Sequence, residues 1–306
     1  MSSQFRSNGK LLLTGEYLVL WGARALAIPL RYGQSMQVKN RSNNGIFWES
    51  FFKGKKWFEA HFNRNFEVDH TNNPDRAKVI LRILKEAHHI TQYHENIFFN
   101  KQIITRLEFD PEWGWGSSST LITNIANWLN IDPYTLSTRT LGGSNYDIAC
   151  AQTNIPIFYR KYGNAFEIRP AFFNPSFKDD LYFIYLGAKQ NSQKSAKEFL
   201  SKNTPSREYI DQISALSEKI AFTDDKNHFI ELIDHHEHIV GTLLKKLPVK
   251  NELFDDFKGT VKSLGAWGGD FVMAVSKLNH KETLNYFSTK GYHVLFRFKE
   301  ISLNKG

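Results

Sequence analysis

A turn rich in glycine and serine, between a predicted strand and a predicted helix, constrains the fold most. QIITRLEFD (102–110) has strand character, and LITNIANWLNI (121–131) carries apolar residues at helical spacing. Between them, PEWGWGSSST contains Gly114 and Gly116, which can adopt positive φ and let the backbone approach a ligand. N–H groups in such a turn and at a helix N-terminus bind anions, although a serine N-cap explains the same letters. The stretch therefore predicts either a capped helix start or a phosphate loop.

Familiar motifs do not decide between these two explanations. The chain has no GxxxxGK[ST] sequence, so a P-loop is excluded, and no GxGxxG sequence opens a βαβ unit as a Rossmann fold requires. The GxSxG sequence of serine hydrolases is also missing. The explanation must come from other parts of the chain.

Composition indicates a globular, cytoplasmic protein. The 306 residues suffice for two domains, and Cys150 is the only cysteine, so no intrachain disulfide can form. The net charge is 39 − 31 = +8, but no run of five Lys or Arg occurs, which argues against nucleic acid as a partner and favours an anionic small molecule. No run of 18 apolar residues predicts a membrane span, and we expect no membrane partner.

Hydrophobic periodicity predicts mixed strands and helices without regular βαβ alternation, so the expected class is α+β. A boundary near residue 160 divides the expected domains into 1–160 and 161–306. The predicted strands include 10–14, 17–22, 35–40, 46–52, 102–110, 155–163, 181–187, 270–276 and 293–298, and the predicted helices are 75–90, with Asp75 as its cap, 121–131, 192–220, 227–247 and 252–264.

Four segments in order resemble the motifs of the GHMP kinases. PEWGWGSSST resembles the P-x-x-G-L-G-S-S-A signature of that superfamily, and GKLLLTGEYLVLWGARALAIPL (9–30) is similar to its first motif. GGSNYDIACAQTNIPIFYR (142–160) resembles the segment of the catalytic aspartate, and SLGAWGGDFVMAV (263–275) the third, glycine-rich motif. Within the mevalonate and phosphomevalonate kinase branch, the Gly-Gly-Asp ending looks more like phosphomevalonate kinase than like mevalonate kinase. The resemblance implies an N-terminal domain related to the ribosomal protein S5 domain 2-like fold and a ferredoxin-like C-terminal α/β domain.

The resemblance also implies ATP and Mg²⁺ as cofactors and assigns residues to them. Backbone groups of two loops would hold the phosphates, and Ser118 would be the Mg²⁺ hydroxyl, with Ser117 and Ser119 as near alternatives. The signature's leucine is Trp115 in this chain, and the usual glycine of the third motif is Trp267. The phosphate-binding residues assigned in this way are Gly114, Gly116, Ser117, Ser118, Ser119, Gly265, Gly268 and Gly269.

Two residues take catalytic roles by the same resemblance. Asp147 would act as general base or orient the acceptor hydroxyl, and Lys10 would lie near it and stabilise the transferring phosphoryl group. A surface lysine and a capping aspartate are the ordinary explanations of these two residues. Candidate contacts for the acceptor are Glu16, Lys189 and Ser192.

A predicted helix carries a histidine-rich stretch whose function the sequence leaves open. His235 lies four residues after Glu231 and three before His238, so one helix face could bind a metal ion. No HExxH pattern and no cysteine supports zinc. Alternatively, a histidine of this stretch, which includes His236, lines the acceptor pocket.

The sequence thus predicts an ATP-dependent small-molecule kinase of isoprenoid precursor synthesis, with phosphomevalonate or mevalonate as acceptor. Homoserine or a sugar is the alternative acceptor, and diphosphomevalonate decarboxylase is a related enzyme. A non-catalytic regulatory or interaction protein with the same fold is the alternative from another class. We expect a monomer or a homodimer.

Overall fold

A computed structural model describes residues 2–42, 44–92, 95–163, 165–187, 195, 198–201, 204–267 and 270–303. The chain forms two compact units that interleave along the sequence. Unit 1 comprises Met1–Gly9, Tyr32–Pro111 and Trp115–Gln152, and unit 2 comprises Lys10–Arg31, Glu112–Gly114 and Thr153–Gly306. The chain passes between the units within two long strands, β1 (Ser2–Leu12) and β2 (Ala25–Asn40). The predicted domain boundary near residue 160, which divides the chain into 1–160 and 161–306, stays a prediction.

Unit 1 is built on a sheet with the strand order β5-β4-β3-β6-β2, and β1 also pairs with β2. β3 runs parallel to β6, while β4 is antiparallel to β3 and β2 is antiparallel to β6. Burial alternates along β3, so one face of the sheet carries core residues such as Trp48. The other bounds are β3 (Ile46–Phe52), β4 (Lys55–Phe62), β5 (Val68–Thr71) and β6 (Lys101–Leu107).

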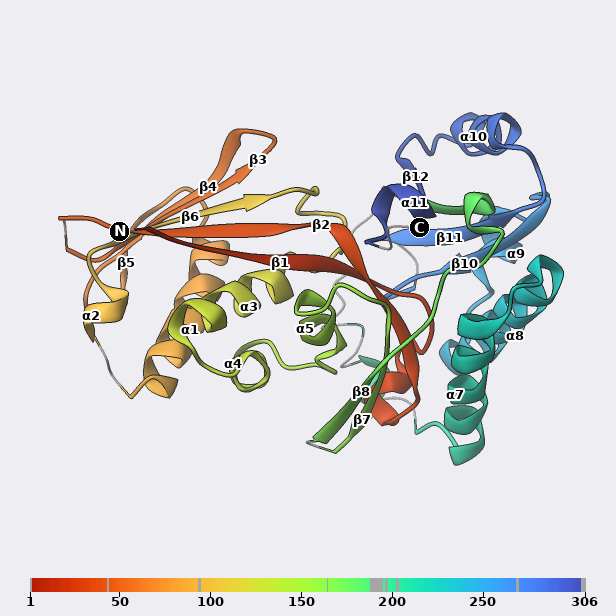
Figure 1. The fold of residues 1–306 in the computed structure, drawn as a ribbon, viewed down its shortest axis with the longest axis horizontal. Coiled ribbons are helices and arrows are strands. Elements are labelled where there is room, and N and C mark those ends of the chain that lie inside the picture. Colours follow the sequence, from red (N-terminus) through yellow and green to blue (C-terminus); the bar gives the residue numbers. More distant parts are fainter. Residues whose placement is uncertain are drawn as a thin grey trace. The chain divides into compact units, whose positions relative to one another are not determined.

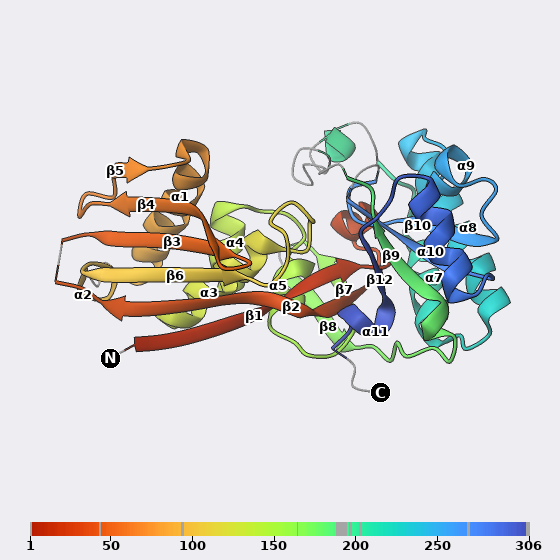
Figure 2. The same cartoon turned by 90° about the horizontal axis from the view of Figure 1, so that it is seen from above.

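The helices of unit 1 cover that core face (Figures 1 and 2). Ile83 and Ile125 place two of them in the same buried cluster as Trp48. The cap of the first helix is Asn73, whose side chain accepts the N–H of Arg76 at 3.1 Å, so the prediction of Asp75 is wrong. The helices are α1 (Pro74–Ile90), α2 (Glu95–Phe98), α3 (Ser117–Leu129), α4 (Pro133–Thr140) and α5 (Tyr146–Ala151).

Unit 2 contains an antiparallel sheet with the order β10-β11-β9-β12. Every residue of β11 is buried, as expected for a strand covered on both faces. A hairpin of β7 and β8 pairs with the first residues of β2. The bounds are β7 (Ile157–Tyr162), β8 (Ala165–Pro170), β9 (Leu181–Tyr185), β10 (Gly259–Ser263), β11 (Phe271–Ser276) and β12 (Leu295–Arg297).

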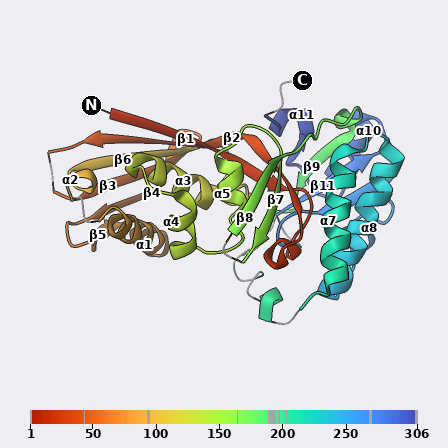
Figure 3. The same ribbon diagram turned by 60° about the horizontal axis from the view of Figure 1, so that its bottom comes forward.

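Two long helices, α7 and α8, lie side by side in unit 2, and α8 packs against β10 (Figure 3). On the other side of the sheet, Phe287 and Val249 join a buried cluster with Val261 and Val272. The helices are α7 (Arg207–Phe222), α8 (Lys226–Leu244), α9 (Val249–Leu253), α10 (His280–Thr289) and α11 (Phe298–Ile301), with short 3-10 turns η1 (Leu18–Trp21) and η2 (Lys178–Asp180).

Three element predictions in unit 2 are wrong. Residues 17–22 form the turn η1 rather than a strand. Residues 252–264 contain the end of α9 and strand β10 rather than one helix. The helix predicted from 192 is interrupted before Ser206, which caps α7, because Pro205 cannot continue a helix. The class nevertheless is α+β, as predicted, and among the described residues no helix is long and apolar enough to cross a membrane.

Candidate active site

The glycine-serine turn leaves the start of α3 without a side-chain cap. Its N-cap is Gly116, which has φ 92° and no side chain, so the prediction of a serine N-cap is wrong. Ser119 is buried and its hydroxyl donates to the Gly116 carbonyl at 2.9 Å. Ser118 is exposed in the first turn. A helix start with free N–H groups, a left-handed glycine and an exposed hydroxyl fits a phosphate group and its metal ion.

On the unit 2 side of the same turn, Gly114 lies against two charged side chains. Lys10 Nζ donates to the Gly114 carbonyl at 2.9 Å. A Cβ atom placed on Gly114 would lie 2.5 Å from Asp270 Oδ2, and the φ of Gly114 is 67°. Only glycine fits this position without a rearrangement. Unit 2 therefore brings together Lys10, Gly114 and Asp270.

Asp270 was not predicted as a site residue. It is nearly buried and directly precedes β11, at the end of the Gly-Gly-Asp sequence. That sequence was the available signal, but the contact with Gly114 joins residues far apart in the chain. A carboxylate against Gly114, whose carbonyl accepts a hydrogen bond from Lys10, makes Asp270 a further candidate for holding a metal ion or for orienting the lysine.

Asp147 lies in the first turn of the short helix α5 and is half-buried. Its position is fixed by Asn145, which has φ 67° and whose side chain accepts from Ser137 at 2.8 Å and donates to Thr138 at 3.1 Å. α5 packs against α3, the helix that begins at Ser117. Unit 1 thus carries the predicted aspartate and the predicted phosphate-binding serines on neighbouring helices.

No family model and no curated protein sequence matches this chain. Several solved structures, in contrast, match this chain over nearly its full length. The phosphomevalonate kinase of Streptococcus pneumoniae, solved with phosphomevalonate and AMPPNP, matches with a TM-score of 0.71 at 16% identity, over 97% of this chain and 100% of that one. The mevalonate kinase of Methanococcus jannaschii gives 0.68 at 17%, over 97% of each chain, and the galactokinase of Lactococcus lactis, complexed with galactose, gives 0.65 at 11%, over 97% and 92%.

All three proteins are GHMP kinases. This chain has the GHMP kinase fold. The match over nearly the full length of both chains confirms the predicted two-domain α+β architecture. The identities are too low for the fold match to select an acceptor, since mevalonate, phosphomevalonate and galactose enzymes all share it.

Two tryptophans, Trp115 and Trp267, stand where the GHMP kinase motifs that these segments resemble have leucine and glycine, and both are buried. The Trp115 ring is fully buried in unit 1, with ring centroids 5.7 Å from Tyr32 and 5.9 Å from Phe109. Trp267 has φ 43°, a conformation that favours glycine, and its ring contacts α8 at Gly241. Both rings are therefore packing residues of their own unit.

Two other residues predicted for the candidate site, Gly265 and Glu16, lie in unit 2. Gly265 has φ 68° and open space around its missing side chain. Glu16 is fully buried and accepts a hydrogen bond from Lys262. Among the described residues, no group of three or more His, Cys, Asp or Glu side chains could hold a metal ion, so the histidine-rich stretch of α8 forms no such site there. Lys189, Ser192, Gly268 and Gly269 lie outside the described residues.

Proposed function

We propose that this chain is an ATP- and Mg²⁺-dependent kinase that phosphorylates a small anionic acceptor of the mevalonate pathway, phosphomevalonate or mevalonate. The observation that carries the proposal is the uncapped start of α3 behind Gly116, in a chain with the GHMP kinase fold. The net charge of +8 suits an anionic acceptor. The phosphomevalonate kinase with a similar fold was solved with an acceptor and an ATP analogue of this kind.

The residue roles follow from the chemistry of phosphoryl transfer, which needs positioning and charge stabilisation more than covalent catalysis. Bound ATP and Mg²⁺ supply the phosphoryl group and neutralise part of its charge. The N–H groups of residues 116–119 bind phosphate oxygens, and the exposed Ser118 hydroxyl is the metal-binding group. Gly265, Gly268 and Gly269 contribute a second loop to the same phosphates.

Asp147 orients the acceptor hydroxyl and accepts its proton. Lys10, which donates to the Gly114 carbonyl, stabilises negative charge on the transferred group through its ammonium. Lys189 and Ser192 remain proposed contacts of the acceptor. A cytoplasmic location and a monomeric or homodimeric state complete the proposal, with neither nucleic acid nor membrane as partner.

Nucleotide binding to the turn is tested by thermal unfolding with AMPPNP and Mg²⁺. At a concentration of 100 Kd, the analogue should stabilise the wild-type protein by about 2.7 kcal/mol. Gly114→Ala should abolish most of this stabilisation, because its Cβ meets Asp270 at 2.5 Å and its φ of 67° disfavours alanine.

Gly291→Ala is the matched control in the same unit, since Gly291 has φ 88° but open space around it. Gly291→Ala should have the same strain of an alanine at positive φ and should still be stabilised by AMPPNP as much as the wild-type protein. An AMPPNP effect that is equal in wild type and Gly114→Ala would place the nucleotide elsewhere, and no effect in wild type would argue against an ATP-binding protein.

A further inference from the structure

The segment Thr14–Tyr17 of the first motif is tied to four different elements of unit 2. Each of its four residues makes a hydrogen bond with a separate partner, all within that unit. The contacts reach α7, α8, β10 and the loop after β10. They are Thr14 Oγ1 with Ser217 Oγ at 2.7 Å, Gly15 N–H to His236 Nε2 at 3.0 Å, Lys262 Nζ to Glu16 Oε1 at 2.5 Å, and Tyr17 O–H to the Ala266 carbonyl at 2.8 Å.

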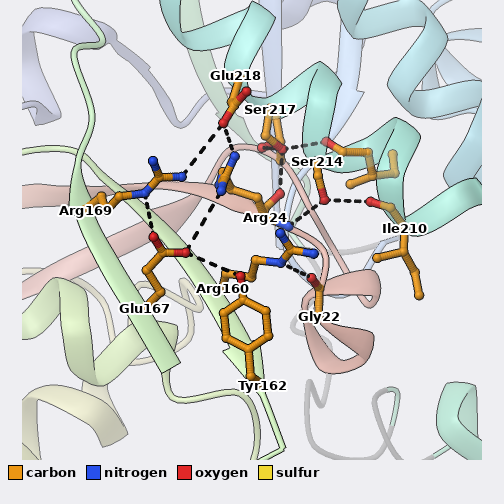
Figure 4. A network of polar contacts seen from close by, with 12 residues as sticks. Gly22, Arg24, Arg160, Tyr162, Glu167, Arg169, Ile210, Ser214, Ser217 and Glu218 are labelled. Carbon is orange, nitrogen blue, oxygen red and sulfur yellow. Dashed lines mark hydrogen bonds and ion pairs between the residues drawn. The ribbon is translucent and has the colours of Figure 1, made fainter. Parts of the chain in front are cut away.

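The far end of this first-motif loop is held to α7 as well (Figure 4). The N–H of Arg24 donates to Ser214 at 2.9 Å, and the Arg24 carbonyl accepts from Ser217 at 2.8 Å. The Arg24 guanidinium pairs with Glu218 on the same helix. The loop between β1 and β2 is therefore anchored at both ends, by residues that lie on the same helix.

The centre of these contacts is a buried charged cluster of Glu16, Lys262, Glu237 and His236. All four side chains are at most 2% exposed. Lys262 Nζ lies 2.5 Å from Glu16 and 3.4 Å from Glu237. A single ammonium balances one carboxylate, so with both carboxyls ionised the cluster would hold an uncompensated buried charge.

His236 supplies no positive charge to the cluster. Its Nε2 accepts the N–H of Gly15 and therefore carries no proton, which places the proton of the neutral ring on Nδ1. Burial, followed by the charge of Lys262 and that of His235, lowers the pKa of His236 well below its usual value. The balance of charge must come from a proton on one of the two carboxyls.

Glu237 is the better site for that proton. Glu16 makes the short bond to Lys262, whereas Glu237 lies farther from the ammonium and accepts the Ser263 N–H at 3.1 Å. Burial raises the pKa of Glu237 to about 8, with the charge of Lys262 acting against this shift and the negative charge of Glu16 contributing to it. Burial also raises the pKa of Tyr17 to about 12, so this phenol does not titrate near neutrality.

The cluster lies beside a strained part of the backbone. Tyr17 has φ 61° and Trp267 has φ 43°, and both are bulky residues in the left-handed region. Such strain persists only where surrounding contacts over-determine the conformation. The bond from Tyr17 to Ala266 and the bond from Glu16 to Lys262 are two such contacts.

We propose that Glu16 and Lys262 are positioning residues that fix the loop after β10 relative to the first motif, with Glu237 carrying a proton beside them. Glu16 then acts through Lys262 and does not contact the acceptor. The kinetic part of this inference rests on the proposed kinase function, whereas the part that concerns stability does not.

Protonation of Glu237 in the folded protein is tested by measuring the free energy of unfolding between pH 6.5 and 8 in wild type and in Glu237→Gln. The folded protein binds a proton at Glu237 that the unfolded chain, with its ordinary carboxyl pKa, has released. Stability should therefore fall as pH rises toward 8, with a slope of up to one proton. Glu237→Gln should fold normally and lose this dependence of stability on pH. If the variant keeps the same slope, the inference that Glu237 is protonated in the folded protein is wrong.

The window from pH 6.5 to 8 separates the effect of Glu237 on stability from that of His236. The lowered pKa of His236 makes stability fall only below about pH 6.5, where the unfolded imidazole becomes protonated. The charged groups that act on Glu237 are Lys262 from β10 and Glu16 from the first-motif loop. Glu16→Gln should also reduce the slope, because Glu237 then becomes the only anion beside Lys262.

The positioning role is tested by the kinetics of Glu16→Gln, Lys262→Met and Lys262→Arg. A displacement of about 1 Å in a catalytic loop costs up to 10²-fold, so Glu16→Gln and Lys262→Met should each lower kcat/KM for ATP by about 10–10²-fold. Lys262→Arg keeps the positive charge and should therefore retain part of the kcat/KM that Lys262→Met loses. Lys290→Met is the control, since it removes a surface pair with Asp256 at 2.9 Å in the same unit and should leave turnover unchanged.

The double variant Glu16→Gln/Lys262→Met tests whether Glu16 and Lys262 act on turnover as one pair. If the two residues act as one pair, the double variant should lose no more activity than Lys262→Met alone. Additive losses, or a Glu16→Gln effect confined to the KM of the acceptor, would overturn the positioning role. If wild type shows no turnover with any acceptor, the proposed function fails, and the pH dependence of stability still decides the proton on Glu237.

Discussion

Replacing Asp147 with asparagine should lower kcat by about 10²–10⁴-fold without lowering the melting temperature. Asparagine keeps the size of the side chain and its ability to accept a hydrogen bond, but it cannot accept a proton from the acceptor hydroxyl. The Asp147 carboxylate accepts a hydrogen bond from the N–H of the next residue in α5, Ile148, at 3.1 Å, and the side-chain oxygen of asparagine can accept the same bond. Steady-state turnover and thermal unfolding of the same preparation measure both effects.

Asp75→Asn is the matched control for this substitution. Asp75 lies in the first turn of α1 as Asp147 does in α5, so both variants remove a negative charge from a helix N-terminus. The Asp75 side chain is 96% exposed, and its loss should leave turnover unchanged. Near-wild-type turnover of Asp147→Asn would exclude this aspartate as the general base.

Replacing Trp115 with alanine should lower the free energy of unfolding by about 3–5 kcal/mol. The indole is fully buried, and its removal leaves a cavity between Tyr32 and Phe109. Because Gly114 and Gly116 flank this residue, the glycine turn also loses its anchor in unit 1. Urea denaturation gives the loss of stability, and AMPPNP binding gives the effect on the turn.

Trp115→Leu separates the volume of the side chain from its apolar character. Leucine stands at this position in the signature that the turn resembles, and it fills part of the cavity, so it should cost less than alanine. A loss of less than about 1 kcal/mol in Trp115→Ala would show that the ring is not a packing residue. A tighter binding of AMPPNP in Trp115→Leu would show that the tryptophan obstructs the nucleotide.

The sequence predicted elements well where local signals agreed with tertiary packing. Helix α1 has a cap, a proline in its first turn and apolar residues at helical spacing, and it forms where expected. The failures arose where packing overrides periodicity. Residues 259–263 form strand β10 because they pair with β11, and a period-based prediction of a helix could not include a partner at residues 272–276.

The sequence points to single residues of the candidate site, which stay predictions, but not to the contacts between them. Ordered motifs identified Lys10, Gly114, Ser118 and Asp147, and the bond from Lys10 to the Gly114 carbonyl lies within one of the compact units. Asp270 was missed because only the folded chain brings it against Gly114. The pairing of Glu16 with Lys262 joins residues 246 positions apart, which a single sequence does not reveal.

The most direct test of the proposed function is ADP release by the wild-type protein with ATP, Mg²⁺ and one acceptor at a time. Phosphomevalonate, mevalonate, homoserine and galactose form the panel, and Asp147→Asn is the catalytic control. We predict ADP release with phosphomevalonate or mevalonate that is absent without acceptor and falls at least 10²-fold in the variant. Release with none of the four acceptors, or release that Asp147→Asn leaves unchanged, would contradict the account.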